Sequence, residues 1–258
     1  MSYFKVGVML DSLRKPTFEE NASFAAEIGA DGFQMYYNGV KVLTAEQIAA
    51  QQAHLEKCKL TAAAICGDIG GWVDKSKVEE RLELTRIIMD YTRDLGAKVV
   101  TSHIGRIPED VNDPMYQHLL GIMEKVGRLA RERGLTYAIE TGPETTAVLR
   151  EFLDRLDGGV GVNFDPANLV MAGYSKNGAD SVAVVAPYIV HTHAKDGTPA
   201  EHETPLGEGG VDFHAWLTEL KRNGYKGFLT IERECGDDPA ADCKNAMAFL
   251  RKVDAEIE

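Results

Sequence analysis

The chain has 258 residues, with 28 Lys and Arg against 40 Asp and Glu, so its formal net charge is −12. This negative charge disfavours nucleic acid and anionic membrane surfaces as partners. With 44% hydrophobic residues, 25 Gly and 9 Pro, the composition is that of a globular protein with a full core, and it excludes a disordered or fibrous chain.

Nothing in the sequence indicates export or membrane insertion. The segment MSYFKVGVMLDSLRK lacks a basic region followed by a long apolar stretch, and no run approaches the roughly 20 apolar residues of a spanning helix. The four cysteines, Cys58, Cys66, Cys235 and Cys243, show no CxxC spacing, which favours free thiols over a zinc or redox centre. We therefore expect a cytoplasmic protein.

Short apolar segments rich in β-forming residues recur along the whole chain. They begin near Phe4, Gly32, Leu60, Ala97, Leu135, Val160, Ile189 and Gly227. The segments between them have helical periodicity, as in VEERLELTRIIMDYTRDL, where Leu82, Ile88 and Tyr91 share one apolar stripe. The sequence therefore predicts alternating strands and helices.

Helix boundaries are also marked in the sequence. Thr44-Ala-Glu-Gln47 fits a capping box that opens the second helix. Four glycines, Gly29, Gly96, Gly134 and Gly224, stand where helices should end.

Eight strands alternating with helices in about 250 residues predict an α/β fold, a closed (β/α)₈ TIM barrel. The alternative is an open, doubly wound sheet. Neither G-x-G-x-x-G nor G-x-x-x-x-G-K-[ST] follows the first strand, which argues against that alternative. With no linker, low-complexity tract or strong repeat, we expect one domain over residues 1–258.

Polar residues gather where the predicted strands end. They are Ser102 and His103, Glu140, Asn163 and Asp165, His191, His193 and Lys195, and Glu232 and Glu234. In a closed barrel, functional side chains lie at these carboxyl ends. Buried carboxylates and imidazoles without partners cost several kcal/mol each, so their concentration at one rim predicts a compensating cation.

Glu140, Asp165, His193 and Glu232 come from four consecutive predicted strands and offer three carboxylates and one imidazole. This oxygen-rich set suits one divalent ion, with Mn²⁺, Mg²⁺ or Co²⁺ preferred and Zn²⁺ possible. Each residue alone has a structural alternative, since a Glu can cap a helix and Asp165-Pro166 can start one. His191 and His193 face the same side of their strand, and of the two we expect His191 to be the structural one.

Five segments carry a family resemblance: AIETG (138–142), NFDPAN (163–168), HTHAKD (191–196), PLGEGGVDF (205–213) and TIERE (230–234). In this order and at these strand positions, the chain resembles the xylose isomerase-like TIM-barrel sugar isomerases and epimerases. That family includes sugar phosphate isomerases and epimerases, ketose 3-epimerases, inosose dehydratases and hydroxypyruvate isomerases. The resemblance implies ligand roles for Glu140, Asp165, His193 and Glu232, and acid/base roles for the two glutamates.

The sequence differs from two individual branches of this family, the ketose 3-epimerases and the endonuclease IV branch. Asn168 stands where ketose 3-epimerases usually have a substrate-contacting His, and Lys195-Asp196-Gly197 stands where they usually carry an Arg. His103 matches a histidine of the endonuclease IV branch, but the further histidines of that three-metal site are missing. The candidate substrate contacts are His103, Asn168, His191, Lys195 and Trp72, where Trp72 either walls a sugar ring or packs its loop.

These residues predict a metal-dependent isomerase or epimerase of a small sugar, keto-polyol or hydroxy-carbonyl compound, acting through a metal-stabilised enediolate. Because Glu140 and Glu232 lie three strands apart, they should face opposite sides of that enediolate, which favours epimerisation. The alternative is a dehydratase of an inosose-like or keto-sugar substrate; a non-catalytic sugar-binding subunit fits less well.

Two further expectations concern ligands and assembly. The predicted rim offers only Arg106, Lys195 and Arg233 as cations, which disfavours phosphorylated substrates. Barrels of this family often pair, so a homodimer or homotetramer is expected, with Trp72, Tyr36 and Tyr37 contributing aromatic surface.

Overall fold

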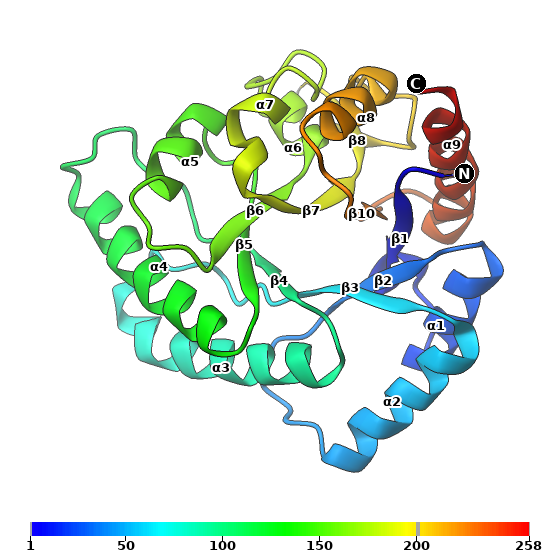
Figure 1. The fold of residues 1–258 in the computed structure, drawn as a ribbon, viewed down its shortest axis with the longest axis horizontal. Helices are drawn as coiled ribbons and strands as arrows, with labels where there is room; N and C mark the ends of the chain where they lie inside the picture. The colour runs from blue at the N-terminus through cyan, green and yellow to red at the C-terminus, as the bar shows by residue number, and fades with distance from the viewer. Residues whose placement is uncertain (1, 200–201, 258) are drawn as a thin grey trace.

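The structure, a computed structural model, describes residues 2–199 and 202–257. Eight parallel strands close into a barrel in the order β1-β10-β7-β6-β5-β4-β3-β2 (Figure 1). They are β1 (Lys5–Met9), β2 (Gly32–Tyr36), β3 (Thr61–Cys66), β4 (Val99–Ser102), β5 (Thr136–Glu140), β6 (Val160–Phe164), β7 (Ile189–Ala194) and β10 (Phe228–Ile231). The predicted TIM-barrel fold is confirmed, and every strand starts within two residues of its predicted start.

Helices surround the barrel in Figure 1. They are α1 (Phe18–Glu27), α2 (Ala45–Cys58), α3 (Val78–Asp94), α4 (Pro114–Glu132), α5 (Thr146–Leu153), α6 (Pro166–Met171), α7 (Val182–Val185), α8 (Phe213–Arg222) and α9 (Pro239–Glu256). Short 3₁₀ turns add η1 (Leu10–Leu13), η2 (Lys75–Lys77) and η3 (Ala186–Tyr188). Two short helices, α6 and α7, occupy the crossover from β6 to β7.

The predicted helix boundaries are confirmed. At the start of α2, Gln47 N–H donates to Thr44 Oγ1 at 3.3 Å and Thr44 N–H donates to Gln47 Oε1 at 2.9 Å, which is a capping box. The four predicted glycines each lie two residues beyond the end of α1, α3, α4 or α8 and have positive φ, a geometry that other residues adopt only with strain.

The strand register sets the height of the polar residues in the barrel. Glu140 pairs with Asn163 across β5 and β6, and His193 pairs with Thr230 across β7 and β10. Below this level the strands bury apolar side chains such as Val6 and Val162 in one large core. The predicted site residues therefore rise from the apolar core at the carboxyl end of the barrel.

The loop after β7 carries a small hairpin that the sequence analysis did not predict. In it, β8 (Asp196–Thr198) pairs with β9 (His202–Thr204) in antiparallel fashion. The buried Asp196 carboxylate accepts hydrogen bonds from the N–H groups of Gly197, Gly207, Gly209 and Val211 at 2.8–3.0 Å. One side chain therefore anchors this loop at Gly197 and at three positions within residues 207–211.

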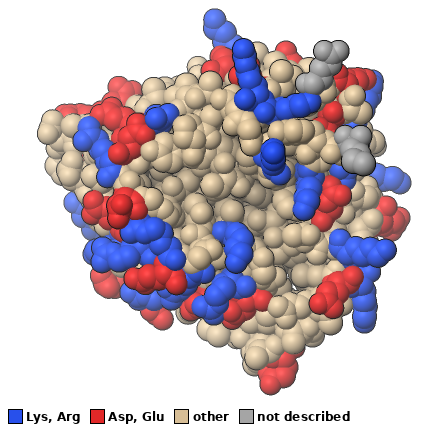
Figure 2. Space-filling view, viewed as in Figure 1, with Lys and Arg blue, Asp and Glu red and all other residues tan. Residues whose placement is uncertain are grey.

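Figure 2 shows Lys and Arg side chains next to Asp and Glu around the edge of the face in view, with mostly uncharged residues at its centre. Charges of both signs alternate there, so this face carries no broad basic surface. Within the described part of the chain, no helix combines the length and the apolar character needed to cross a membrane.

Candidate metal centre

Four side chains that the sequence analysis singled out meet at the carboxyl end of the barrel. Glu140 ends β5, Asp165 follows β6, His193 lies in β7 and Glu232 follows β10. One ligand atom from each lies within 4.8 Å of the others. All four are buried or nearly so. A parallel barrel produces this meeting because all its strands end at the same rim.

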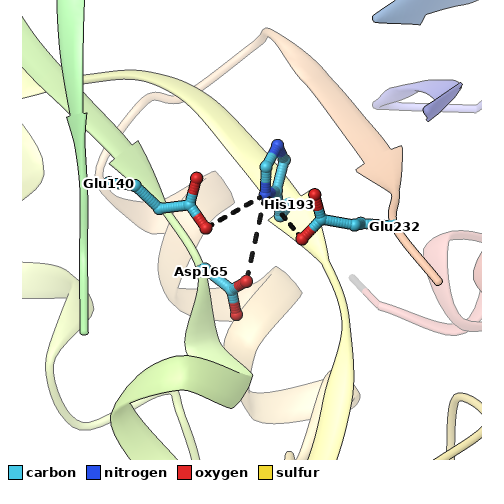
Figure 3. Close-up of side chains that lie close together, drawn as sticks. All are labelled: Glu140, Asp165, His193 and Glu232. Carbon is cyan, nitrogen blue, oxygen red and sulfur yellow. Dashed lines mark ion pairs between the residues drawn. The ribbon is translucent and has the colours of Figure 1, made fainter. Parts of the chain in front are cut away.

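His193 stands at the centre of the cluster. Its Nδ1 lies 3.4 Å from Glu140 Oε1, 3.9 Å from Asp165 Oδ2 and 3.2 Å from Glu232 Oε2. Figure 3 shows Glu140 and Glu232 on opposite sides of the imidazole, with Asp165 between them. The carboxylates therefore face one atom from three directions, as ligands around a cation would.

Two atoms in the cluster are buried without a hydrogen-bond partner, Asp165 Oδ2 and His193 Nδ1. An unsatisfied buried polar atom costs roughly 1–3 kcal/mol. A divalent cation held by the carboxylates and this imidazole nitrogen would satisfy both atoms, and mixed oxygen and nitrogen donors suit such an ion. The residues present therefore fit a divalent metal ion.

The pKa values of the cluster reflect the same need for positive charge. Burial raises the pKa of Asp165 to about 7. Burial also opposes charge on Glu140 and Glu232, yet the positive charge favoured on His193 outweighs it and holds both pKa values below their ordinary range. Burial disfavours the imidazolium, but Glu232 and Glu140 raise the pKa of His193 well above its usual value. Burial disfavours the ionised form of all three carboxylates, and a nearby positive charge favours it.

Gln34, in β2, orients His193 from below. The Nε2–H of His193 donates to Gln34 Oε1 at 2.9 Å, which directs Nδ1 at the carboxylates. The Nε2–H of His191 donates to the same oxygen at 2.9 Å, and Gln34 Nε2 donates to Thr101 Oγ1. The sequence analysis missed Gln34, although one polar residue inside an apolar strand was a usable signal.

Asparagines hold the carboxylate of Glu140. Asn163 Nδ2 donates to Glu140 Oε2 at 3.1 Å, and Asn168 Nδ2 donates to Glu140 Oε1 at 3.0 Å. Asp165 Oδ1 accepts from the Asn168 N–H at the start of α6, so its capping role and its place in the cluster coexist. These bonds fix both Glu140 oxygens and Asp165 Oδ1 before any ligand binds.

Above the cluster lies an open cavity of about 540 Å³. Three predicted substrate contacts line it, His103, Asn168 and Lys195. His103 Nδ1–H donates to Asp68 Oδ2 at 3.0 Å, while its Nε2 lies 3.8 Å from Glu140 Oε1. Glu140, with help from Asp68, raises the pKa of His103 to about 9. Asp68, in the loop after β3, is a second residue that sequence reasoning did not identify.

Lys195 is buried at the cavity wall between two carboxylates. Its Nζ lies 3.2 Å from Glu232 Oε2 and also contacts Glu234 Oε2. Burial opposes its charge, but these carboxylates raise the pKa of Lys195 above its ordinary value. Lys195 is therefore a fixed ammonium ion beside Glu232.

The two remaining candidate substrate contacts, His191 and Trp72, lie outside the cavity, in agreement with the structural alternative that the sequence left open for each. His191 is buried beneath the cluster against Gln34, and burial lowers the pKa of its imidazole well below the usual value. Trp72 is completely buried, and its Nε1–H donates to the Tyr137 hydroxyl at 3.3 Å. Neither lines the cavity, because His191 points into the barrel interior and Trp72 packs the loop after β3.

The fold and the cluster define a TIM-barrel protein with its polar residues at the carboxyl ends of the strands. Residues 22–253 match the sequence model of the family described as "Xylose isomerase-like TIM barrel". The chain belongs to this family, as the resemblance of its strand-end segments predicted.

Known relatives include sugar epimerases and dehydratases. The chain is 24% identical over 269 residues to the 3-dehydro-D-guloside 4-epimerase of Escherichia coli K12, covering 96% of this chain and 99% of that protein. It is 27% identical over 191 residues to an inosose dehydratase of Klebsiella pneumoniae, covering 59% of this chain but only 62% of that enzyme, less than two thirds of its length.

Among solved structures, a xylose isomerase domain protein from Planctomyces limnophilus superposes with a TM-score of 0.88 and 26% identity. That match covers 99% of both chains. The homologues of this chain are therefore enzymes of the sugar epimerase, isomerase and dehydratase family, built on the same barrel.

Proposed function

We propose that this protein is a divalent-metal-dependent isomerase or epimerase of a small sugar, keto-polyol or hydroxy-carbonyl compound. The observation that carries the proposal is the pair of buried, unpartnered atoms, Asp165 Oδ2 and His193 Nδ1, within an acidic cluster under an open cavity. The epimerase relative that aligns over nearly its whole length supports the same reaction class.

Glu140, Asp165, His193 and Glu232 would hold one ion, with Mn²⁺ the first choice and Mg²⁺, Co²⁺ or Zn²⁺ as alternatives. When bound, the ion would polarise a substrate carbonyl and neighbouring hydroxyl and so acidify the C–H bond between them.

Glu140 and Glu232 are the proposed proton carriers. They lie on opposite sides of the His193 imidazole, 3.4 and 3.2 Å from its Nδ1 (Figure 3). A carbon held between them can lose a proton to one carboxylate and receive a proton from the other on the opposite face, which inverts its configuration. This placement favours epimerisation over the transfer of a proton between adjacent carbons by one carboxylate.

The remaining polar groups of the cavity are proposed to bind substrate oxygens. His103, fixed by Asp68, offers Nε2 beside Glu140. Asn168 donates one amide hydrogen to Glu140 and lines the cavity, and Lys195 also lines it and presents its ammonium ion there. His191 and Trp72 take no part in this set, since both are buried away from the cavity.

The second candidate is a dehydratase of an inosose-like or keto-sugar compound. The His103 and Asp68 pair favours it, because an imidazole backed by a carboxylate could protonate a departing hydroxyl after Glu140 or Glu232 removes the proton. A non-catalytic sugar-binding subunit fits less well, since a pure binder has no evident need for three converging carboxylates.

A turnover screen tests the proposal. The metal-loaded protein is incubated with free and phosphorylated ketoses, 3-keto-sugars, inososes and hydroxypyruvate, each with Mn²⁺, Mg²⁺ or Co²⁺. We expect at least one epimerised or isomerised product; loss of water from the substrate would favour the dehydratase instead. A protein that binds metal but turns over none of these classes would contradict the proposal.

We further propose a single-domain, cytoplasmic protein that assembles as a homodimer or homotetramer. Tyr36, at the end of β2, and Val40, Val42 and Val73, in the loops after β2 and β3, are exposed where a second subunit could cover them. Trp72 cannot contribute to that surface, because it is buried. Sedimentation equilibrium at micromolar protein should detect a species larger than the 28.3 kDa chain, and a monomer alone would reject the assembly.

A further inference from the structure

Among the described residues, two cationic side chains line the cavity of about 540 Å³, His103 and Lys195. Each is already matched to a carboxylate, His103 to Asp68 and Lys195 to Glu232 and Glu234. Both cationic side chains on the cavity wall are therefore already paired with carboxylates and leave no free positive charge for a ligand.

The neighbouring guanidinium of Arg233 is neutralised in the same way. Its Nη1 lies 2.7 Å from Glu203 Oε1, and its Nε lies 2.8 Å from Asp242 Oδ2. Glu203 comes from the hairpin strand β9 and itself lines the cavity. The Glu203 carboxylate therefore pairs with Arg233, so the guanidinium charge is neutralised before it can reach a ligand in the cavity.

A second cavity, of about 310 Å³, adjoins the first, and Glu234 lines both. Its one cation besides Arg233, among the residues that the structure describes, is Arg14, whose Nη2 donates to the backbone oxygen of Glu234 at 2.8 Å. Asp11 and Glu232 line the same cavity. Among the described residues that line the two cavities, four carboxylates therefore balance four cationic side chains, and no positive charge is in excess.

Neutralisation of the Lys195 ammonium depends more on Glu234 than its two ion pairs, with Glu232 and Glu234, alone indicate. Glu232 belongs to the cluster proposed to hold a divalent ion, so in the loaded protein its charge is shared with that ion. Glu234 is then the carboxylate left to balance the buried ammonium of Lys195. The Glu234 side chain is 65% exposed, so its charge can be removed without leaving a hole in the core.

We propose that Glu234 sets the charge preference of the cavity by neutralising Lys195, so that the site takes an uncharged, hydroxyl-rich carbonyl compound and rejects phosphate esters. A phosphate group needs unpaired cations or N–H donors to replace its water, and here it would also face the carboxylates of Glu203 and Glu234. The inference rests on the proposed use of this cavity as the substrate site.

The test is binding of inorganic phosphate to the Mg²⁺-loaded protein, measured by calorimetry, in the wild type, Glu234→Gln, Glu234→Gln/Lys195→Met and Asp237→Asn. Asp237 lies in the same loop, is exposed and loses the same unit of charge, which makes it the matched control. Any binding of phosphate by the ion itself is common to all four proteins.

Freeing the ammonium should make Glu234→Gln bind phosphate about tenfold or more tightly than the wild type, as a new charge-assisted hydrogen bond implies. Adding Lys195→Met should abolish the gain, and Asp237→Asn should stay within about twofold of the wild type. Unchanged binding in Glu234→Gln, a gain that survives in the double variant, or an equal gain in Asp237→Asn would each overturn the inference.

A second arm uses ribitol and ribitol 5-phosphate, which differ only by the phosphate. The wild type should bind ribitol 5-phosphate more weakly than ribitol, and Glu234→Gln should move this ratio about tenfold toward the phosphate ester. Tighter binding of the ester by the wild type overturns the inference. A gain in phosphate binding by Glu234→Gln with no binding of either polyol would support the charge role of Glu234 and count against the proposed function alone.

Discussion

Gln34 and His193 stand 159 positions apart in the chain, yet Gln34 Oε1 accepts the Nε2–H of His193 at 2.9 Å inside the barrel. This bond fixes the imidazole so that Nδ1 points at the three carboxylates. We expect Gln34→Leu to lower the affinity for a divalent ion by about 10–100-fold, as loss of such an orienting partner does. Calorimetric titration with Mn²⁺ measures the change. Thr101→Val, which removes only the Gln34 bond to Thr101, should have a smaller effect.

The metal site itself is tested by removing its proposed ligands. Purified protein should carry or bind about one divalent ion per chain, and Asp165→Ala or His193→Ala should weaken binding by an order of magnitude or more. Elemental analysis after dialysis gives the metal content. His202→Ala is the control, because His202 is exposed in β9 outside the cluster and should leave the content unchanged. Equal metal content in all variants would reject the site.

The two glutamates are predicted to exchange protons with the substrate. Glu140→Gln and Glu232→Gln should each lower turnover by roughly 10²–10⁴-fold, because an amide of the same shape cannot carry the proton. In D₂O, deuterium at an inverted carbon supports two carboxylates acting on opposite faces, and label at the neighbouring carbon supports aldose–ketose isomerisation. Turnover without any solvent label, detected by NMR, would count against open proton exchange.

Glu144, in the loop after β5, should make stability depend on pH. Burial raises the pKa of this carboxyl to about 7, although Glu144 Oε2 accepts the Ile107 N–H at 3.1 Å. The folded protein therefore holds its proton more tightly than the unfolded chain. The contribution is complete below about pH 4.5 and is lost as pH rises toward 7, amounting to about 3 kcal/mol.

Glu144→Gln keeps an acceptor for Ile107 but removes the titration. Relative to the wild type, its free energy of unfolding should therefore become larger, meaning greater stability, as the pH rises from about 4.5 to about 7. Urea denaturation at several pH values in this range measures the difference between the two proteins, which cancels the effect of other titrating groups. A difference that does not change with pH would contradict the prediction.

Asp196 is predicted to hold the loop after β7 in place. Asp196→Asn replaces one oxygen by an amide group that cannot accept, so two of its four backbone N–H partners lose their acceptor. Each loss costs about 1–3 kcal/mol, and we expect the free energy of unfolding to fall by about 2–6 kcal/mol in urea denaturation. Gly209→Ala should also destabilise, since its Cβ would lie 2.2 Å from Asp196 Oδ1, whereas Asp237→Asn should not.

The sequence by itself determined the barrel and the identity of the clustered residues. Strand positions follow from short apolar segments separated by helical periodicity, a local pattern that survives whatever the chain packs against. Glu140, Asp165, His193 and Glu232 were recognisable because polar residues at the ends of apolar strands are costly, and parallel strands bring such ends together.

Only the tertiary structure decided what each polar side chain touches. The sequence could not place Gln34 beside His193 or Glu234 beside Lys195, because these pairs join distant strands and loops whose register has no local signal. Nor could it separate a buried Trp72 from a cavity wall, since burial depends on how the loop after β3 packs on Tyr137. The charge balance of the cavity is decided in the same way, because pairing among charged groups depends on distances that exist only once the barrel has closed.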